Sequence, residues 1–184
     1  VSDNPMHQRL YFPYEEAAKM ISGNVLELGC GWGRGVEKLI AAADQYTGLD
    51  KNTELINKLS NAYANHVFET ASFPDLSRFQ DNTFDFVVTF QVIEHIQDDK
   101  KFLEEAQRVL KPKGKIILTT INKSYSLSRN PWHIREYNTK ELQSIMGKYF
   151  RTVDAMGVSG NDKVWDYYEK NKASVKKTMR WDIL

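Results

Sequence analysis

Short apolar segments and longer amphipathic segments alternate along the chain. The apolar segments, which we predict to be strands, are 24–29, 46–50, 66–70, 83–91, 114–122 and 150–158. The amphipathic segments, which we predict to be helices, are 35–43, 52–64, 98–110 and 139–149, with Asn52 or Thr53 capping the second and Thr139 the fourth. Parallel strands need helical crossovers of this length. The pattern therefore predicts an α/β fold with a mostly parallel sheet of about six strands and helices on both faces.

Composition and charge exclude several classes of protein. The 184 residues carry 25 Lys and Arg against 24 Asp and Glu, so the net charge of +1 gives no general case for a nucleic-acid partner. The single cysteine, Cys30, cannot form an internal disulfide or a cysteine metal site. No apolar run reaches the length of a membrane span, and the first residues lack the pattern of a signal peptide. We therefore expect a cytoplasmic protein.

Four glycines lie at the junction between the first strand and the first helix. The stretch "VLELGCGWGRG" places them at 29, 31, 33 and 35. Glycine allows positive φ and close approach of a ligand, and the following helix start offers free N–H groups. Asp50 ends the next strand, 21 residues after Gly29, where a carboxylate can accept both hydroxyls of a ribose. We therefore interpret the glycine loop as the binding site of a nucleoside-bearing cofactor, and we favour this over the alternative that the loop is only a tight turn.

The glycine spacing disfavours a dinucleotide. A G-x-G-x-x-G fingerprint would need glycine at position 34 or 36, which hold Arg34 and Val36, and no phosphate-loop lysine follows. Glu27 precedes the loop and suits a cofactor with a cationic part.

Four motifs in order resemble the class I S-adenosylmethionine-dependent methyltransferases. They are "LELGCGWG", "GLDKN", "FQDNTFDFVVTFQVIEHIQD" and "FLEEAQRVLKPKGKIILTT", and the resemblance covers about residues 20–158. It implies a Rossmann-like fold and one domain over 1–184, with 159–184 as a helical extension or a truncated end. Members of the family usually add an antiparallel seventh strand, which we do not find after residue 158.

The resemblance implies a cofactor site for S-adenosylmethionine. Its methionine part would lie by Glu27 and the glycine loop, its ribose on Asp50, and its adenine by backbone groups where the family often has an acid and this chain has Ser72. Cys30 lies within the loop, where its thiol is expected to pack as a small apolar group. The cofactor-binding candidates are Glu27, Gly29, Cys30, Gly31, Gly33, Asp50, Lys51, Ser72, Phe73 and Gln91.

The acceptor side is expected in the loop "RNPWHIREYN" at 129–138 and in the N-terminal segment. His133 and His95 are the candidate bases. Trp132, Arg135, Tyr137, Tyr11 and Tyr14 are the candidate substrate contacts. The alternative for the loop is a structural one, in which Trp132 and Arg135 pin it to the fold.

Two further features leave alternatives open. Glu94 and His95 occupy a place where some methyltransferases of catechol-like quinone precursors hold a divalent metal, but Gln91 replaces one acid, so we expect no metal.

The tail at 163–184 is basic and aromatic. It is a helix that packs on the domain, or the start of a segment that this chain lacks, or, less favoured, a contact with a membrane surface.

These observations predict a methyltransferase that moves the methyl group of S-adenosylmethionine to a hydroxyl, amine or carbon of a small molecule. The alternatives are a non-catalytic S-adenosylmethionine-binding module and a nicotinamide-dependent oxidoreductase. The sequence does not indicate the acceptor or the oligomeric state.

Overall fold

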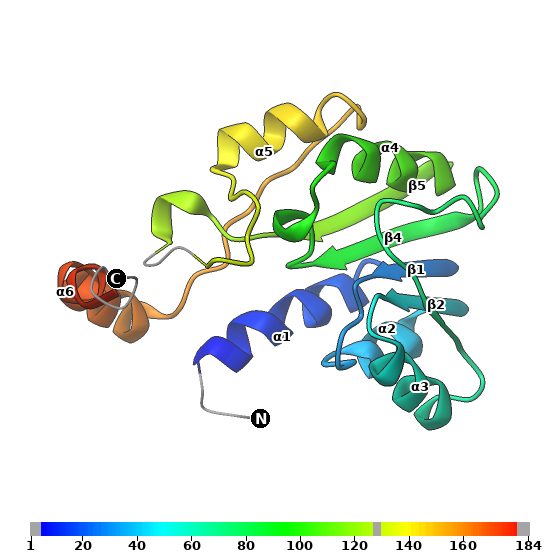
Figure 1. Ribbon diagram of the computed structural model, residues 1–184, viewed down its shortest axis with the longest axis horizontal. Helices are drawn as coiled ribbons and strands as arrows, with labels where there is room; N and C mark the ends of the chain where they lie inside the picture. The colour runs from blue at the N-terminus through cyan, green and yellow to red at the C-terminus, as the bar shows by residue number, and fades with distance from the viewer. Residues whose placement is uncertain (1–4, 127–129, 180–184) are drawn as a thin grey trace.

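Five parallel strands form one sheet in the order β3-β2-β1-β4-β5 (Figure 1). The computed structural model describes residues 5–126 and 130–179. The strands are β1 Asn24–Leu28, β2 Gln45–Asp50, β3 Val67–Thr70, β4 Phe84–Phe90 and β5 Leu110–Thr119. β1 pairs with both β2 and β4, so the strand order reverses between β1 and β4. Ligands of such sheets bind beyond the carboxyl ends of the strands at this point.

Helices cover both faces of the sheet, as the sequence predicts (Figure 1). The helices are α1 Pro5–Ala18, α2 Val36–Ala42, α3 Thr53–Ala62, α4 Asp99–Val109, α5 Thr139–Met146 and α6 Asp162–Met179, with short 3-10 turns η1 Ile93–His95 and η2 Lys123–Tyr125. One core cluster joins the sheet to α1, α2 and α3. The other joins it to α4 and α5.

β1 shows how the sequence produces these two layers. Successive side chains of a strand point to opposite faces. Val25 packs in the cluster with α1, α2 and α3, whereas Leu26 and Leu28 pack in the cluster with α4, and all three are fully buried. The alternation places Glu27 on the α1 side, where it is also fully buried. A buried carboxylate needs hydrogen-bond partners, and these define part of the site described below.

The predicted sixth strand at 150–158 is wrong. The described residues of this segment form no strand, and the sheet has five strands instead of about six. Phe150 and Val153 pack against the α4 core cluster, but Met156 is 87% exposed and Val158 is 44% exposed. The large apolar residues at 150, 153, 156 and 158 do not alternate strictly, so they cannot present one apolar face to a sheet.

Two helical details also differ from the sequence prediction. Helix α1 was not predicted, and Tyr14 and Ala17 pack one of its faces against the sheet. Asn138, and not Thr139, caps α5: its side chain accepts from the backbone N–H of Glu141, whose carboxylate accepts from the backbone N–H of Asn138. Asn52 caps α3 as predicted.

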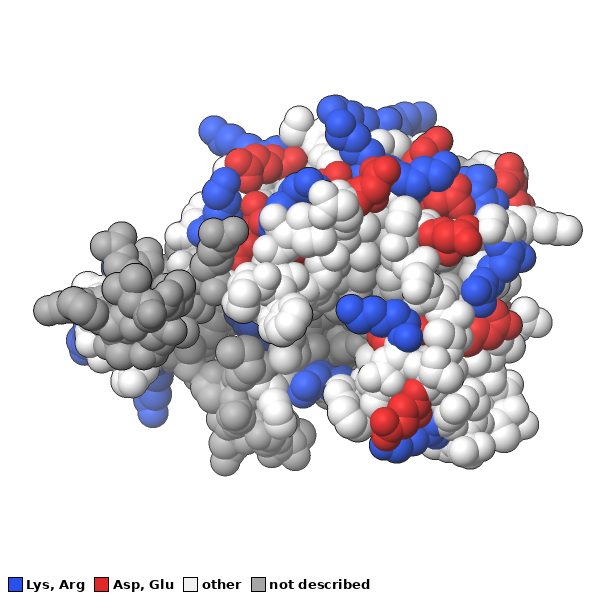
Figure 2. Space-filling model, in the orientation of Figure 1, with Lys and Arg blue, Asp and Glu red and all other residues white. Residues whose placement is uncertain are grey.

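The C-terminal helix α6 lies beside η2. The Trp165 ring packs edge-on against Tyr125, and the Tyr168 hydroxyl donates to the Tyr125 carbonyl oxygen at 3.2 Å. None of the helices in the described ranges is long and apolar enough to cross a bilayer. Figure 2 shows acidic and basic side chains intermingled over one face, with no broad patch of one sign among the described residues drawn there.

Candidate active site

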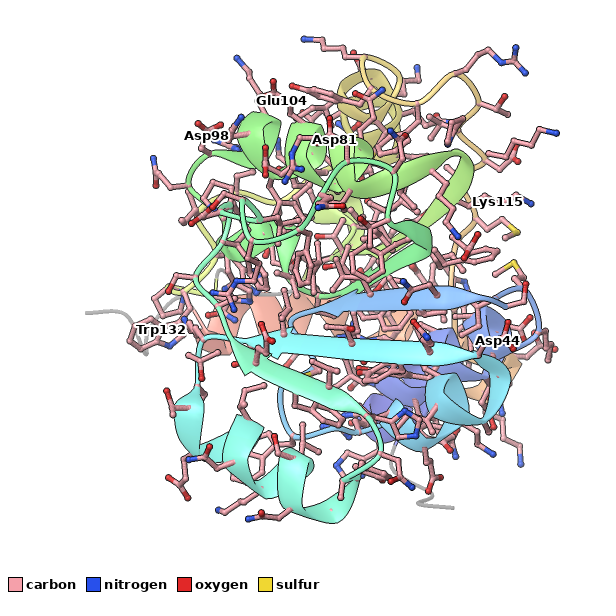
Figure 3. All side chains as sticks on the ribbon, turned by 90° about the vertical axis from the view of Figure 1, so that its right-hand side faces the viewer. Asp44, Asp81, Asp98, Glu104, Lys115 and Trp132 are labelled. Atoms are coloured by element: carbon pink, nitrogen blue, oxygen red, sulfur yellow. The ribbon has the colours of Figure 1, made fainter. Side chains whose placement is uncertain are left out.

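The loops that follow β1, β2, β4 and β5 meet at the carboxyl edge of the sheet. Figure 3 shows Trp132, from the loop after β5, at the opposite end of the strands from Asp44 and Lys115. Backbone hydrogen bonds join neighbouring loops at this edge. The N–H of Gly29 donates to the carbonyl of Leu49 at 2.8 Å, and the N–H of Gln91 donates to that of Thr119 at 2.9 Å.

The glycine loop is shaped mainly by packing inside the protein. Gly29 and Gly33 have φ of 84° and 72°, a conformation that favours glycine. A Cβ on Gly29 would lie 2.4 Å from Val92, and a Cβ on Gly33 would lie 2.4 Å from Leu59. These two glycines therefore let α3 and the segment after β4 close on the loop, which the sequence alone did not reveal.

Gly31 is the glycine of this loop that faces open space. Its φ is 51°, and a Cβ there would meet no atom within 4 Å. Its backbone N–H donates to Oδ2 of Asp50 at 2.9 Å, and Oδ1 of Asp50 accepts from the N–H of Asn52 at 2.9 Å. Each carboxylate oxygen keeps a second acceptor position, so Asp50 can accept two further hydroxyl groups beside the open face of Gly31. Lys51, next along the chain, is exposed.

Glu27 lies beneath the loop with no exposed surface. Its Oε1 accepts from the Tyr14 hydroxyl at 2.8 Å, and its Oε2 accepts from the Tyr46 hydroxyl at 2.5 Å. Burial raises the pKa of Glu27 to about 7, although both hydrogen bonds act in the opposite direction. Burial also raises the pKa of both tyrosines, so they remain donors. A nearby cation would favour the ionised form of Glu27.

Tyr14 and Tyr11, two candidate substrate contacts, lie on different faces of α1. Tyr14 is in the core, where its ring packs edge-on against Phe90 at 4.6 Å, and a Cβ on Gly35 would lie 2.1 Å from its ring. Tyr11 is half-buried, and its hydroxyl donates to Glu37 at 3.4 Å. The role of both tyrosines in substrate binding stays a prediction.

Other cofactor candidates are spread along the same edge. Cys30 is buried, and burial raises the pKa of its thiol, so it is a neutral packing group. Ser72 is exposed, whereas the Phe73 ring packs edge-on against Phe102 in the core. Gln91 has a φ of 58° and directs its amide toward the Thr119 hydroxyl at 3.2 Å. Strained non-glycine residues of this kind cluster at functional sites.

Glu94 lies at the centre of the acceptor side. It is 1% exposed, and its Oε2 accepts from the Thr120 hydroxyl at 2.9 Å, whereas its Oε1 has no hydrogen-bond partner among the described atoms. Burial raises the pKa of this carboxyl group. The backbone carbonyl of Glu94 accepts from the N–H of Ile134 at 2.8 Å and so holds the loop after β5 against the end of β4.

His133 is held by a partner on each ring nitrogen. Its Nδ1 lies 2.7 Å from Oε1 of Glu136, and its Nε2 lies 3.0 Å from the side-chain nitrogen of Asn130. A carboxylate accepts and an amide N–H donates, so this pattern assigns the proton to Nδ1. The ring of His95 packs edge-on against that of His133 at 4.9 Å, and its Nδ1 lies 2.8 Å from the Trp132 carbonyl oxygen.

These side chains could also hold a metal ion. One ligand atom each from Glu94, His95 and His133 lies within 4.8 Å of the other two. Two imidazoles and one carboxylate suit a divalent transition metal better than magnesium, which prefers oxygen ligands. Both ring nitrogens of His133 have protein partners in the structure, and burial raises the pKa of Glu94, which disfavours its ionised form. The expectation of no metal remains a prediction.

Asp99 anchors the rest of the loop. It forms an ion pair with Arg135 and accepts from the Tyr137 hydroxyl at 2.7 Å. Arg135 thus has an ion-pair partner that can hold the loop, as the structural alternative for this loop expects. The Trp132 side chain, in contrast, is 78% exposed and does not pin the loop by packing. Burial raises the pKa of Tyr137, which stays a donor.

Sequence reasoning missed several members of the site. Tyr46, Asp99, Thr120 and Asn130 were not singled out. Tyr46 pairs with Val25 across the sheet, so strand alternation puts it on the same face as Glu27. Alternation within the strand can be read from the sequence, whereas the register that pairs Tyr46 with Val25 is a property of the folded sheet. Thr120 and Asn130 reach Glu94 and His133 because of the path of the loops after β5, and no sequence pattern predicts that path.

Comparison with known proteins supports the same family that the motifs suggest. A family model described as a methyltransferase domain matches residues 26–118, from β1 to β5. A probable S-adenosylmethionine-dependent methyltransferase of Mycolicibacterium smegmatis is 32% identical over 163 residues, which is 85% of this chain and 63% of that protein. A ubiquinone biosynthesis O-methyltransferase of Xanthomonas oryzae pv. oryzae is 29% identical over 110 residues, covering 57% of this chain and 46% of that protein.

The chain thus spans less than two thirds of the length of either relative. Among solved structures, the PH0226 protein of Pyrococcus horikoshii OT3 superposes with a TM-score of 0.71 at 22% identity and covers 88% of each chain. At that identity, the likeness shows the fold alone.

Proposed function

Because this chain belongs to the class I S-adenosylmethionine-dependent methyltransferase family, we propose that it transfers the methyl group of S-adenosylmethionine to a hydroxyl group of a small molecule. An amine or carbon acceptor is the alternative within the same reaction. A cytoplasmic location and a single domain over 1–184 belong to the same proposal.

The residues at the carboxyl edge fit this cofactor. The open space at Gly31 lies beside the Asp50 carboxylate, which has acceptor positions left for a ribose diol. A cationic methionine part would favour the ionised form of the buried Glu27, whereas a pyrophosphate would disfavour it. When bound, S-adenosylmethionine supplies an electrophilic methyl carbon on its sulfonium sulfur. The juxtaposition of Gly31 and Asp50 is the observation that carries the proposal.

The remaining candidates divide by their surroundings. Gly29 and Gly33 would shape the pocket by letting Val92 and Leu59 close on it, and Cys30 would pack beneath it. Lys51, Ser72, Phe73 and Gln91 lie at the loops around it, where backbone groups at Ser72 and Phe73 would meet the adenine. The positions that we propose to form or shape the cofactor pocket are Gly29, Cys30, Gly33, Lys51, Ser72, Phe73 and Gln91.

His133 is the base that we assign to the acceptor hydroxyl. The Glu136 carboxylate fixes the proton on Nδ1, which leaves Nε2 as the acceptor position. Asn130 fills that position in the structure, and the acceptor hydroxyl would replace it as the donor. Because a hydroxyl needs deprotonation and an amine does not, a His133–Glu136 pair favours a hydroxyl acceptor. His95 is the second candidate base.

The acceptor would be aligned by the loop after β5. The exposed indole of Trp132 offers an apolar surface, and Asp99 fixes the position of Arg135 and Tyr137 behind it. Methyl transfer needs an in-line approach and exclusion of water, so a rigid loop wall contributes by orientation.

Turnover tests this proposal against the two alternatives. The protein is incubated with S-adenosylmethionine and a panel of phenols, alcohols and their matched amines, and formation of S-adenosylhomocysteine is measured. A methyltransferase forms it with at least one hydroxyl acceptor and loses this activity in His133→Ala. A binding module binds the cofactor without turnover, and a nicotinamide-dependent oxidoreductase binds reduced nicotinamide cofactors instead.

A further inference from the structure

Three side chains that can ligate a metal meet where the loop after β5 touches the turn after β4. Glu94 and His95 belong to η1, and His133 lies in the loop after β5. One ligand atom from each lies within 4.8 Å of the other two, and no other three His, Cys, Asp or Glu side chains in the described ranges form such a group. Ligands of one zinc ion lie roughly 3.4 Å apart, so small side-chain rotations would bring these three atoms onto an ion.

The hydrogen bonds of the two imidazoles orient them as ligands. A histidine that binds a metal through one ring nitrogen donates the N–H of the other to a carboxylate or a backbone carbonyl. Nδ1 of His133 lies 2.7 Å from Oε1 of Glu136, and Nδ1 of His95 lies 2.8 Å from the carbonyl oxygen of Trp132. Because a carboxylate and a carbonyl only accept, both rings are assigned their proton on Nδ1. Nε2 of each ring is therefore the ligand atom.

Glu94 offers the third ligand atom. The residue is 1% exposed, and the Thr120 hydroxyl donates to its Oε2, whereas its Oε1 has no hydrogen-bond partner among the described atoms. A buried polar atom without a partner is unfavourable, and a cation beside Oε1 would supply the missing partner. His95 is exposed, so an ion can reach the cluster from solvent.

This ligand set selects the type of ion. Two imidazoles and one carboxylate suit zinc, which often takes three protein ligands and keeps a fourth position open, whereas magnesium prefers an octahedron of oxygens. The side-chain nitrogen of Asn130 donates to Nε2 of His133 at 3.0 Å in the structure. An ion would displace this neutral hydrogen bond and leave the Glu136 contact on Nδ1 in place.

We propose that Glu94, His95 and His133 form a zinc site whose occupation blocks methyl transfer. The ion would take Nε2 of His133, the position that the acceptor hydroxyl would use, so zinc and the acceptor exclude each other. Zinc would thus be a reversible inhibitor and not a cofactor, and the metal-free protein is the form that turns over. The zinc site stands on geometry alone, whereas its inhibitory effect rests on the proposed function.

Titration of the metal-free protein with zinc chloride tests the site without any acceptor. Calorimetry should show one zinc ion bound by the wild type and at least about tenfold weaker binding by His95→Ala and by Glu94→Gln. Glu136→Gln, which removes the partner of Nδ1, should also weaken binding, by about tenfold or more. His7→Ala, which removes an exposed histidine of α1 outside the cluster, should retain the wild-type affinity. Thermal unfolding confirms that each variant is folded.

No zinc binding by the folded wild type, or unchanged affinity in folded His95→Ala and Glu94→Gln, would overturn the site. In the turnover assay, zinc should inhibit the wild type, a chelator should restore it, and His95→Ala should need at least about tenfold more zinc for the same fractional inhibition. Full turnover with the site occupied would overturn the inhibitory role. A protein that methylates an acceptor but binds no zinc contradicts the zinc site alone. A protein that binds zinc through these residues but never turns over contradicts the proposed function, and the inhibitory role with it.

Discussion

Nδ1 of His133 lies 2.7 Å from Oε1 of Glu136, on a loop whose backbone is tied to Glu94 at the end of β4. The carboxylate determines which nitrogen of the ring carries the proton, so the pair would orient His133 as the base of the proposed reaction. The side chains are 11% and 15% exposed, so the pair is sheltered from water but not sealed.

Removal of His133 should affect the chemical step. We expect His133→Ala to lower kcat by about 10²–10⁴-fold, with little change in affinity for S-adenosylmethionine, because a general base acts on the acceptor. Glu136→Gln should lower kcat less than His133→Ala does, with KM nearly constant. Steady-state kinetics with an acceptor from the turnover panel measure both.

Chemical rescue separates catalysis from support of the loop. Added imidazole should restore part of the activity of His133→Gly, which a structural role would not allow. A variant with full turnover would transfer the role to His95, and equal losses of turnover, cofactor affinity and thermal stability would indicate a structural residue.

Turnover should not depend on a metal ion. Although Glu94, His95 and His133 could ligate one, the nitrogens of His133 already have protein partners. We expect less than stoichiometric metal in the purified protein by mass spectrometry and unchanged turnover after chelation. If chelation abolished turnover and magnesium or zinc restored it, the three residues would be ligands and His133 would not be the base.

Burial of Glu27 should make stability depend on pH. Its pKa rises to about 7 in the folded protein from 4.5, so between these values the folded state binds a proton that the unfolded chain releases. Its contribution is therefore fully present below pH 4.5 and is lost as the pH rises through 7, which amounts to up to about 3 kcal/mol. Urea unfolding at a series of pH values measures it.

The control for this pH dependence is a neutral variant of the same shape. Between pH 5 and 8, Glu27→Gln should lose less unfolding free energy than the wild type. Glu54→Gln, on the exposed side of α3, should retain the wild-type dependence. Parallel curves for wild type and Glu27→Gln would show that Glu27 does not titrate in this range.

The five strands of the sheet could be predicted from the sequence because each is marked by residues within or next to the strand itself. Buried parallel strands are short apolar runs, and the helices between them have clear caps such as Asn52. The segment at 150–158 has similar composition, but its strand assignment depends on whether its apolar residues face the sheet, which is a tertiary property. Helix α1 was not predicted, although Tyr14 and Ala17, which lie about one helical turn apart, form its packed face.

The candidate site is predicted less completely. Spacing located the glycine loop and Asp50, but the neighbours that require glycine at 29 and 33 are Val92 and Leu59, which are distant in sequence. The hydrogen bond from the Tyr14 hydroxyl to Glu27 was not predicted either, and the expected role of Tyr14 at the substrate stays a prediction. Such contacts arise from how α1 and α3 dock on the sheet, and a single sequence carries little information on that.

The most direct test of the account is the affinity of the protein for S-adenosylmethionine with and without the Asp50 carboxylate. Calorimetric titration should show one site in the wild type. Asp50→Asn should bind S-adenosylmethionine about tenfold or more weakly, since charge-assisted hydrogen bonds contribute roughly 1.5–3 kcal/mol each. The control variant Asp44→Asn changes a residue at the opposite edge of the sheet (Figure 3) and should keep the wild-type affinity. Thermal unfolding confirms that each variant is folded. Equal affinity in a folded Asp50→Asn variant, or no binding by the folded wild type, would contradict the account.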